Sequence, residues 1–367
     1  MWSAAASLCL ALCAAVVPAA AGARPLGVGT GRAPAATVDR SGTAYIAYNA
    51  TDGDVIACAI ALHAPPRCTP HPVIADGSNA GAAPPLLAAP AVGTVELVSR
   101  RAGDRLYVSR DGARTFTDEG SLGDAVYATG TIAPGGEALV VDRRPGFAVS
   151  LGSVADPTLG RAIMLGGERH PAGESAVTWA GRTPLAVHAN RRATTVFTFH
   201  ATRGSLADPA AWRPGRRLGP SRTLAVANGG HGVYLLRQPL HRRWLTLIHR
   251  GRGGRLSPPH RAPRRVVHSA VGALALAEDE HGRLIAAWQT RPRDALVAAV
   301  SRDGVHWSAR RVLARHQRRV GRMSLAVGHN GNGVLVWAPA GGGEVRALRV
   351  STRSFLRHRR HRASRRA

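Results

Sequence analysis

Apolar runs alternate with short polar turns along most of the chain, and one pattern of residues recurs. In its first copy, the apolar run of residues 43–48 follows Gly42, and similar runs follow six later glycines. These glycines are Gly93, Gly136, Gly181, Gly232, Gly282 and Gly333, each 43 to 51 residues after the one before. Short apolar runs bounded by Gly, Pro, Asp and Asn are typical of β-strands, so the pattern predicts an all-β chain.

The spacing of the copies predicts how the strands are organised. A near-constant period of roughly 40–50 residues made of short strands is the signature of a β-propeller. In the first repeat we expect four strands, at residues 35–39, 43–48, 55–61 and 69–74. Residues 26–28 should supply the outer strand that the last repeat lacks, which would close a ring of seven four-stranded blades over residues 24–355.

Both ends of the chain differ from the repeats. Residues 1–23 have the apolar core and small-residue cleavage positions of a secretory signal peptide, so we expect a secreted, extracellular protein. Residues 356–367 form an Arg- and His-rich tail without an apolar pattern, which we expect to be disordered. No later run reaches the roughly 18 apolar residues of a membrane-spanning helix. We also expect the protein to be a monomer.

Four cysteines occur in the chain, and two of them lie outside the predicted signal peptide. Cys58 falls on the predicted third strand and Cys68 just before the fourth. In an exported protein such a pair is expected to form a disulfide that joins adjacent outer strands. A metal site is disfavoured because no pair of histidines accompanies the two cysteines.

The net charge of +27 comes from 49 basic residues, all of them Arg, against 22 acidic ones. One interpretation is codon bias expressed on a solvated surface. The other is adhesion to an anionic polymer such as nucleic acid or an acidic cell-envelope glycan. The sign of the charge alone does not choose between these two interpretations.

Two predicted turns between a third and a fourth strand share a further motif. One reads Ser-Arg-Asp-Gly-Ala-Arg-Thr-Phe over residues 109–116, and the other reads Ser-Arg-Asp-Gly-Val-His-Trp over residues 301–307. Both resemble the Asp box of sialidase-like (BNR-repeat) propellers, Ser-x-Asp-x-Gly-x-Thr-Trp. The resemblance implies a structural role for its matching residues, which are Ser109, Asp111, Phe116, Ser301, Asp303 and Trp307. It also favours six blades as the alternative to seven.

The same resemblance implies a candidate ligand site in the first repeat. Arg32-Ala33-Pro34 stands where sialidases carry an Arg-Ile-Pro motif whose Arg binds the substrate carboxylate, and it departs from that motif at Ala33. A guanidinium fork suits a carboxylate because two parallel hydrogen bonds can form. Asp52 and Asp54 follow on the next loop, where the family keeps its acid/base Asp. The ligand-binding candidates are therefore Arg32, Asp52 and Asp54.

Catalysis is not expected from this sequence. Sialidases need a late nucleophilic Tyr activated by a Glu, but the last of the five tyrosines is Tyr234, and no catalytic residue can be assigned. No metal cluster or phosphate-binding loop is recognisable, so no cofactor is expected. We interpret the chain as a non-catalytic binding module whose ligand is unknown, with carbohydrate or an anionic polymer as candidates. A sialidase-like glycoside hydrolase and an adhesin for cell-envelope polymer or nucleic acid are the alternatives.

Overall fold

The computed structural model describes most of the chain between residues 24 and 355. The described ranges are 24–74, 83–101, 103–121, 127–132, 137–142, 148–153, 163–165, 174–180, 183–189, 192–200, 208–229, 232–242, 244–251, 256–261, 273–290, 294–317 and 319–355. The predicted signal peptide and the basic tail lie outside these residues. Among the described residues, no helix has the length and apolar character needed to cross a membrane.

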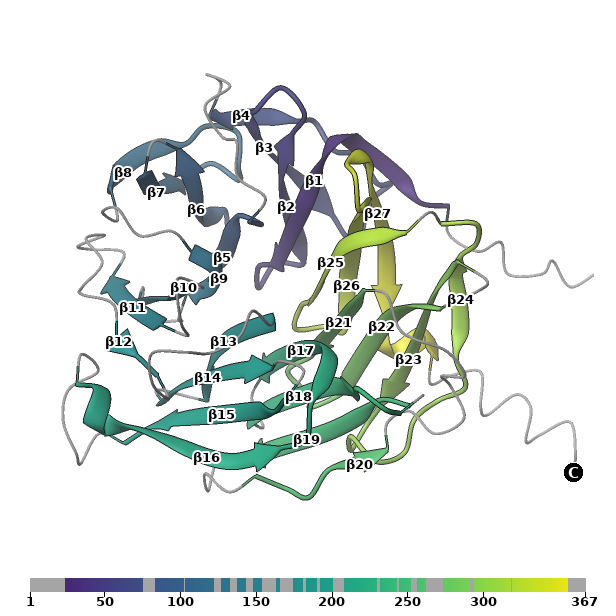
Figure 1. Ribbon diagram of the computed structural model, residues 1–367. Coiled ribbons are helices and arrows are strands. Elements are labelled where there is room, and N and C mark those ends of the chain that lie inside the picture. Colours follow the sequence, from purple (N-terminus) through teal and green to yellow (C-terminus); the bar gives the residue numbers. More distant parts are fainter. Residues whose placement is uncertain are drawn as a thin grey trace, which may run out of the picture.

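The strands form six sheets in which sequence neighbours pair antiparallel, and Figure 1 shows these sheets arranged around a common centre. Two sheets come from the second and third repeats. They contain β5 (Leu86–Ala91), β6 (Thr94–Arg101), β7 (Gly103–Ser109) and β8 (Thr117–Ser121), followed by β9 (Tyr127–Ile132), β10 (Glu137–Asp142), β11 (Ala148–Ser153) and β12 (Ile163–Met164).

Three more four-stranded sheets follow. The first contains β13 (Glu174–Ala180), β14 (Thr183–Ala189), β15 (Thr194–Phe199) and β16 (Trp212–Leu218), and the short 3-10 helix η2 (Pro209–Ala211) precedes β16. The second contains β17 (Ser221–Gly229), β18 (Gly232–Pro239), β19 (Thr246–Gly251) and β20 (His260–Arg261). The third contains β21 (Leu274–Glu278), β22 (Leu284–Thr290), β23 (Ala295–Ser301) and β24 (Arg311–Ala314).

The sixth sheet joins the two ends of the repeat region. Its seven strands, in order, are β25 (Val320–Val327), β26 (Asn332–Pro339), β27 (Gly343–Ser351), β1 (Leu26–Val38), β2 (Thr43–Ala50), β3 (Val55–Ala61) and β4 (His71–Ile74). The predicted strands of the first repeat are present, although the fourth begins at His71 rather than at residue 69. The predicted strand at 26–28 is not separate, because it continues through β1 into the next predicted strand.

Strand β1 has two different partners along its length. Leu26 to Gly31 pair with β27, whereas Gly31 to Val38 pair with β2. The register shifts between Arg32 and Ala35, where Ala33 adopts a φ of 51°, a left-handed conformation that is uncommon outside glycine. This bulge is the point at which the chain leaves one partner strand for the other.

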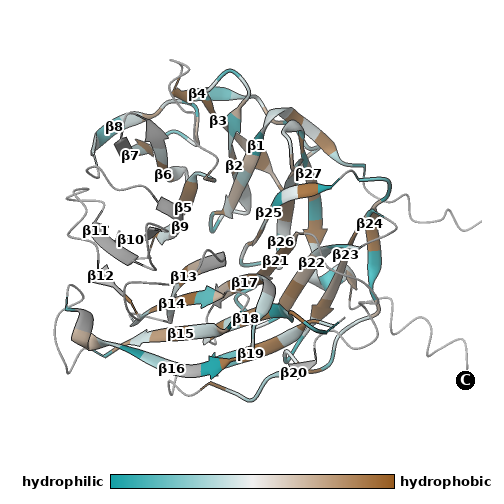
Figure 2. Ribbon diagram, viewed as in Figure 1, coloured by the Kyte–Doolittle hydropathy of each residue, from teal (hydrophilic) through white to brown (hydrophobic). Residues whose placement is uncertain are grey.

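The apolar core lies between neighbouring sheets. Figure 2 shows hydrophobic residues along middle strands such as β22 and β23. One buried cluster packs Leu236 and Leu247 of one sheet against Trp288 and Trp307 of the next. Where both faces of a sheet are covered, as for β22 and β23, the middle strands read as continuous apolar runs rather than as alternating ones. This burial is the physical reason for the repeated apolar runs in the sequence.

The repeat glycines serve two different purposes. Gly42, Gly93 and Gly282 have φ values of 86°, 72° and 74°, so they occupy left-handed turn positions between a first and a second strand. In the last repeat this position belongs to Gly331, with φ 77°, and not to the predicted Gly333. At Gly333 a Cβ atom would overlap the backbone oxygen of Ala326, so this glycine permits close strand approach instead.

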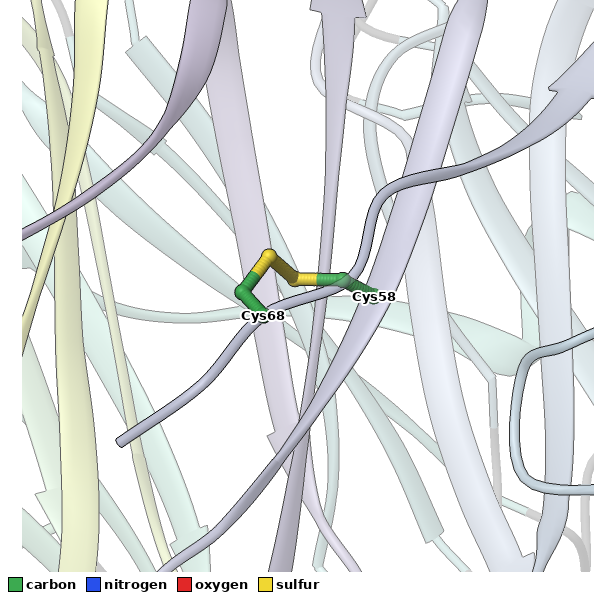
Figure 3. Close-up of a disulfide and its surroundings, with 2 residues drawn as sticks. All are labelled: Cys58 and Cys68. Atoms are coloured by element: carbon green, nitrogen blue, oxygen red, sulfur yellow. A yellow bond between two sulfur atoms is a disulfide. The ribbon is translucent and has the colours of Figure 1, made fainter. Parts of the chain in front are cut away.

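The predicted disulfide is present. Cys58 of β3 is bonded to Cys68, which lies on the segment leading to β4, and the two Cα atoms are 5.5 Å apart (Figure 3). Cys58 is fully buried and packs with the apolar side chains of β2 and β26. The bond therefore holds the short outer strand β4 and its preceding loop against the core.

Replacing Cys58 and Cys68 together by Ser should lower the free energy of unfolding by about 2–3 kcal/mol, because a loop of this size loses its cross-link in the unfolded chain. Urea unfolding of both proteins measures the difference. Reductant should move the wild-type midpoint to that of the variant and leave the variant unchanged. Equal midpoints in oxidising buffer would contradict a stabilising role for the bond.

Candidate functional site

The innermost strands surround a cavity of about 750 Å³. Its lining residues belong to β1, β9, β13, β17, β21 and β25. Most of the lining is formed by small and branched apolar residues. The hydroxyl-bearing lining residues are Thr37, Thr131, Thr178, Thr223 and Ser324, and the charged ones are Glu278 and Arg322. Hydroxyl-bearing residues therefore line the cavity on five strands, although the Thr223 hydroxyl itself is buried, and charged residues line it at only two positions.

The two ends of this arrangement carry different connections. We call the end at which the innermost strands begin the entry end. Because neighbouring strands are antiparallel, the connections from second to third strands also lie there. The turns from first to second and from third to fourth strands lie at the opposite end. Arg322 is near the start of β25 and so belongs to the entry end, whereas Glu278 ends β21 and belongs to the opposite end.

The structure places Arg32 at the entry end, at the bulge of β1. It pairs across the sheet with Asn49, and its side chain is exposed. The left-handed Ala33 follows it, so the departure from Arg-Ile-Pro coincides with a backbone conformation that a β-branched residue would adopt only with strain. Arg32 therefore occupies the predicted strand entrance on a backbone unlike the one that the resemblance implies.

Asp52 and Asp54 lie on the turn between β2 and β3, at the same end as Arg32. The backbone N–H of Asp54 donates to the Asp52 carboxylate over 3.1 Å, and Gly53 adopts a φ of 94°. Burial raises the pKa of the neighbouring Tyr48, and the negative charge of Asp52 raises it further. The predicted ligand residues thus lie at the same end of neighbouring strands, and Asp52 also accepts a hydrogen bond within the β2–β3 turn.

Other arginines stand at the entry end beside Arg32. Arg315 and Arg319 are exposed on the connection between β24 and β25, and Arg322 lies on β25 itself. Strands β25 and β1 are neighbours around the cavity, because Ala36 N–H donates to the Ser324 hydroxyl over 3.0 Å. We call Arg32, Arg315, Arg319 and Arg322 the entry-end arginines. Arg32 was a sequence candidate, but Arg315, Arg319 and Arg322 were missed because the sequence is rich in Arg throughout.

The first predicted Asp box forms a closed turn at the opposite end. The Asp111 carboxylate accepts hydrogen bonds from the backbone of Arg114 and Thr115 at 3.0 Å each, and from the Thr115 hydroxyl at 2.6 Å. The contacts from Thr115 are the largest cause of the lowered pKa of Asp111. Ala113 has a φ of 67° where the family has Gly, and its buried methyl group packs near Tyr45.

The second copy forms the same kind of turn with one residue fewer. Asp303 accepts from the backbone N–H groups of Val305 and His306 at 2.9 and 2.7 Å. The His306 ring contacts the second carboxylate oxygen at 2.7 Å, as Thr115 does in the first copy. Trp307 is buried and donates its indole N–H to the Gly304 carbonyl at 2.9 Å. All these contacts are internal to the turn.

Two buried carboxylates at the opposite end were missed by the sequence reasoning. Asp39 accepts from the Ser41 hydroxyl at 2.6 Å and the Tyr45 hydroxyl at 2.9 Å. Asp279 accepts from Arg283 Nε at 2.6 Å and the Thr352 hydroxyl at 2.8 Å. Each is the first residue of an Asp-x-x-Gly pattern that ends at Gly42 or Gly282. This pattern is typical of turns in which the Asp side chain bonds to the backbone, so the sequence could have indicated both residues.

Replacing Asp39 by Asn should lower the free energy of unfolding by about 1–3 kcal/mol at pH 7, because the amide nitrogen cannot accept the Tyr45 hydroxyl or the Gly93 N–H. Burial alone raises the pKa of Asp39, but its hydrogen bonds outweigh burial and the pKa is lowered. Its stabilisation is therefore complete above the unfolded pKa of about 3.9 and is lost as the pH falls through the folded value. Urea unfolding at several pH values should show the two proteins converging in acid. A difference in unfolding free energy between the two proteins that stays constant with pH would contradict this role of the Asp39 carboxylate.

A Tyr–Glu pair occurs at the opposite end from Arg32. Tyr234 is buried and stacks on His249, with ring centroids 4.3 Å apart. Burial raises the pKa of Tyr234 to about 12, with a further contribution from the negative charge of Glu278. A nucleophilic Tyr needs a lowered pKa or an adjacent base. This pair is therefore unsuited to the role that sialidases give to Tyr and Glu.

Among the described residues, no group of three His, Cys, Asp or Glu side chains is arranged to hold a metal ion. No protein-family model and no curated protein sequence matches this chain. The similarity of this chain to known proteins is therefore seen in the structure and not in the sequence.

Several solved structures resemble the chain at low sequence identity. An ulvan lyase of polysaccharide lyase family PL25 matches with a TM-score of 0.57 and 10% identity, over 90% of this chain and 96% of that one. The fold is β-propeller-like. AofleA from Arthrobotrys oligospora matches with a TM-score of 0.52 and 12% identity, over 79% of this chain and 89% of that one. YCF48 bound to D1 peptide matches with a TM-score of 0.55 and 10% identity, over 90% and 95% of the two chains.

Proposed function

We propose that this chain is a secreted seven-bladed β-propeller that binds an anionic polysaccharide at its entry end without cleaving it. Five blades are the five four-stranded sheets. The seven-stranded sheet divides at β1 into two more blades: residues 26–31 complete the blade of β25 to β27, and residues 31–38 begin the blade of β2 to β4. The division supports seven blades over the six that the sialidase resemblance favours.

The observation that carries the binding proposal is the group of entry-end arginines, of which Arg322 lines the cavity. Arg32 and Arg322 come from the neighbouring strands β1 and β25, and Arg315 and Arg319 lie on the connection into β25. Meanwhile, the carboxylates of Asp39, Asp111, Asp279 and Asp303 are used by turns at the opposite end. At the entry end this positive charge is opposed by Asp52 and Asp54 on the β2–β3 turn, by Asp294 on the β22–β23 connection, and by Glu344 at the start of β27, which forms an ion pair with Arg346.

A carbohydrate fits this site better than a nucleic acid. Besides the buried Thr223, the cavity is lined by hydroxyl-bearing residues on four strands, which suits hydrogen bonding to sugar hydroxyls. Aromatic platforms for stacking bases are absent from the residues that line the cavity. One structural neighbour was solved bound to -[GlcA(1-4)Rha3S]-, a uronate- and sulfate-bearing saccharide, with a TM-score of 0.58 and 10% identity. An acidic glycan is therefore the polymer class that we propose.

We propose that the chain does not cleave by the sialidase route, because the groups that this route needs lie apart. Arg32 is at the entry end, whereas Tyr234 and Glu278 are at the opposite end and the pKa of Tyr234 is raised. We propose that the two Asp-box turns act only in folding, because their carboxylates are occupied by turn hydrogen bonds.

The test is affinity electrophoresis of the purified protein in gels that contain polygalacturonate, dextran sulfate, neutral dextran or double-stranded DNA. The proposal predicts retardation by polygalacturonate, none by neutral dextran, and weaker retardation by DNA at equal charge concentration. The polymer should also keep its chain length, and a fluorogenic sialoside should not be hydrolysed. Stronger retardation by DNA would favour a nucleic-acid adhesin, and sialoside hydrolysis lost in Arg32→Ala would favour the hydrolase.

A further inference from the structure

Arg315 and Arg319 lie on the connection between β24 and β25, whose described residues belong to no helix or strand. Directly after Arg315, His316 adopts a φ of 54°, a left-handed conformation that is uncommon outside glycine. A loose connection would have to become ordered when its arginines bind a polymer, and that ordering lowers the affinity. The contacts that hold this connection therefore bear on the proposed site.

Gln289 of β22 holds the backbone on both sides of Arg319. Its side chain is fully buried. Its Nε2 donates to the Gln317 carbonyl over 3.2 Å, and its Oε1 accepts the backbone N–H of Val320 over 3.1 Å. The Arg319 carbonyl itself accepts the N–H of Ala340, on the turn between β26 and β27, over 2.8 Å. One buried amide thus supplies both the donor and the acceptor that two backbone groups of the connection need.

Gln317 extends this hold to Arg315. Its Nε2 donates to the Arg315 carbonyl over 2.7 Å, and its Oε1 accepts the indole N–H of Trp337 over 2.9 Å. Nη1 of Arg346 lies 3.4 Å from the same oxygen. The connection is therefore anchored to β22 on one side and to β26 on the other, while the two arginines that it carries are exposed.

The fold does not itself require a glutamine at position 289. The equivalent residue of β26 is Ala338, because it follows Trp337 as Gln289 follows Trp288, and both tryptophans pair with the innermost strand of their sheet. Ala338 is almost fully buried as well. A buried amide is costly to remove from water unless it is hydrogen-bonded, and the bonds of Gln289 to the connection offset that cost. Its polar group therefore serves the connection rather than the packing of β22.

We propose that Gln289 is a positioning residue for polymer binding, which acts through Gln317 to hold Arg315 and Arg319 in the arrangement that takes the acidic polymer. This rests on the proposed function and names what fixes two of the four entry-end arginines. The other two lie on β1 and β25, where strand pairing holds the backbone. A binding group that is held in place beforehand loses less entropy on binding, so Gln289 raises the affinity without touching the polymer.

Titration of labelled polygalacturonate at a fixed salt concentration, in a double-mutant cycle, tests this role. Gln289→Met should weaken binding by roughly fivefold. In the background of Arg315→Gln with Arg319→Gln, the same substitution should weaken binding by less than about twofold, because it acts through those arginines. In the background of Arg32→Gln with Arg322→Gln, which removes the same amount of charge, the fivefold loss should remain.

A second measurement reads the connection without any polymer. Amide hydrogen exchange at Val320 should become faster in Gln289→Met, because the N–H loses its acceptor. Thr352→Val removes a buried hydroxyl at the opposite end that donates to Asp279 over 2.8 Å, and it should change neither polygalacturonate affinity nor exchange at Val320. Gln317→Met should repeat the affinity pattern of the cycle, which keeps the test decisive if Gln289→Met does not fold.

Three outcomes would overturn the assignment. Equal losses from Gln289→Met in the two arginine backgrounds would make Gln289 a general structural residue. Unchanged affinity in Gln289→Met, with faster exchange at Val320, would show that binding does not need the connection to be held. Unchanged exchange at Val320 would show that Gln289 does not hold the connection. If polygalacturonate fails to bind the wild type while exchange at Val320 depends on Gln289, the hold on the connection stands and the proposed function fails.

Discussion

Replacing Arg32, Arg315, Arg319 and Arg322 together by Gln is expected to weaken polygalacturonate binding by roughly 30-fold or more. Exposed ion pairs contribute about 0.2–1 kcal/mol each, so four of them at the middle of that range sum to about 2 kcal/mol. Gln is shorter than Arg and has fewer donors, but it stays polar and uncharged, so the change removes the charge while keeping the surface hydrophilic. Titration of fluorescently labelled polygalacturonate at a fixed salt concentration measures the affinity of both proteins.

A matched variant separates the position of the charge from its amount. Arg40, Arg114, Arg302 and Arg310 are exposed and lie on turns at the opposite end, so replacing them by Gln removes the same four charges. This variant should lose only a few-fold in affinity, through the weaker long-range attraction of a less basic protein. Equal losses in the two variants would show that binding follows net charge, and codon bias would then be the better account of the arginines.

Removing residues 24–31 is expected to abolish cooperative folding at 37 °C. This segment supplies the part of β1 that pairs with β27, and it includes the buried Val28. Losing about five backbone hydrogen bonds at about 1 kcal/mol each and one buried Val at about 1.5–3 kcal/mol approaches the total stability of a typical domain. The open edge of β27 would also be free to pair with other chains.

Calorimetry and size-exclusion chromatography of the truncated protein measure this effect. A synthetic peptide of residues 24–34 should restore a cooperative transition by adding the missing strand, whereas a scrambled peptide should not. A truncated protein that melts within a few degrees of the wild type would contradict closure of the ring by β1.

The fold was predictable because strands that are buried on both faces need apolar residues at successive positions, and these appear as continuous apolar runs in the sequence. The runs beginning at residues 43, 55 and 284 became β2, β3 and β22. The Cys58–Cys68 bond was predictable because both residues fell beside adjacent expected strands. The sequence did not show that the turn glycine of the last repeat is Gly331 rather than Gly333. The two glycines are two residues apart and look alike in sequence, although one serves a turn and the other a close approach of strands.

The candidate site was less accessible to sequence reasoning. Arg32 was singled out by a motif, but nothing local distinguishes Arg315, Arg319 or Arg322 from other arginines in so basic a chain. Their grouping depends on which strands become neighbours around the cavity, a long-range property.

Arginine footprinting tests most directly whether an acidic glycan binds at the entry end. The wild-type protein would be treated with phenylglyoxal, with and without saturating polygalacturonate, and modification of each arginine would be quantified by mass spectrometry. Strong protection of Arg32, Arg315, Arg319 and Arg322, with Arg40, Arg114, Arg302 and Arg310 modified as before, is the result expected. Protection of the second set, or uniform protection of both, would contradict the proposed binding surface.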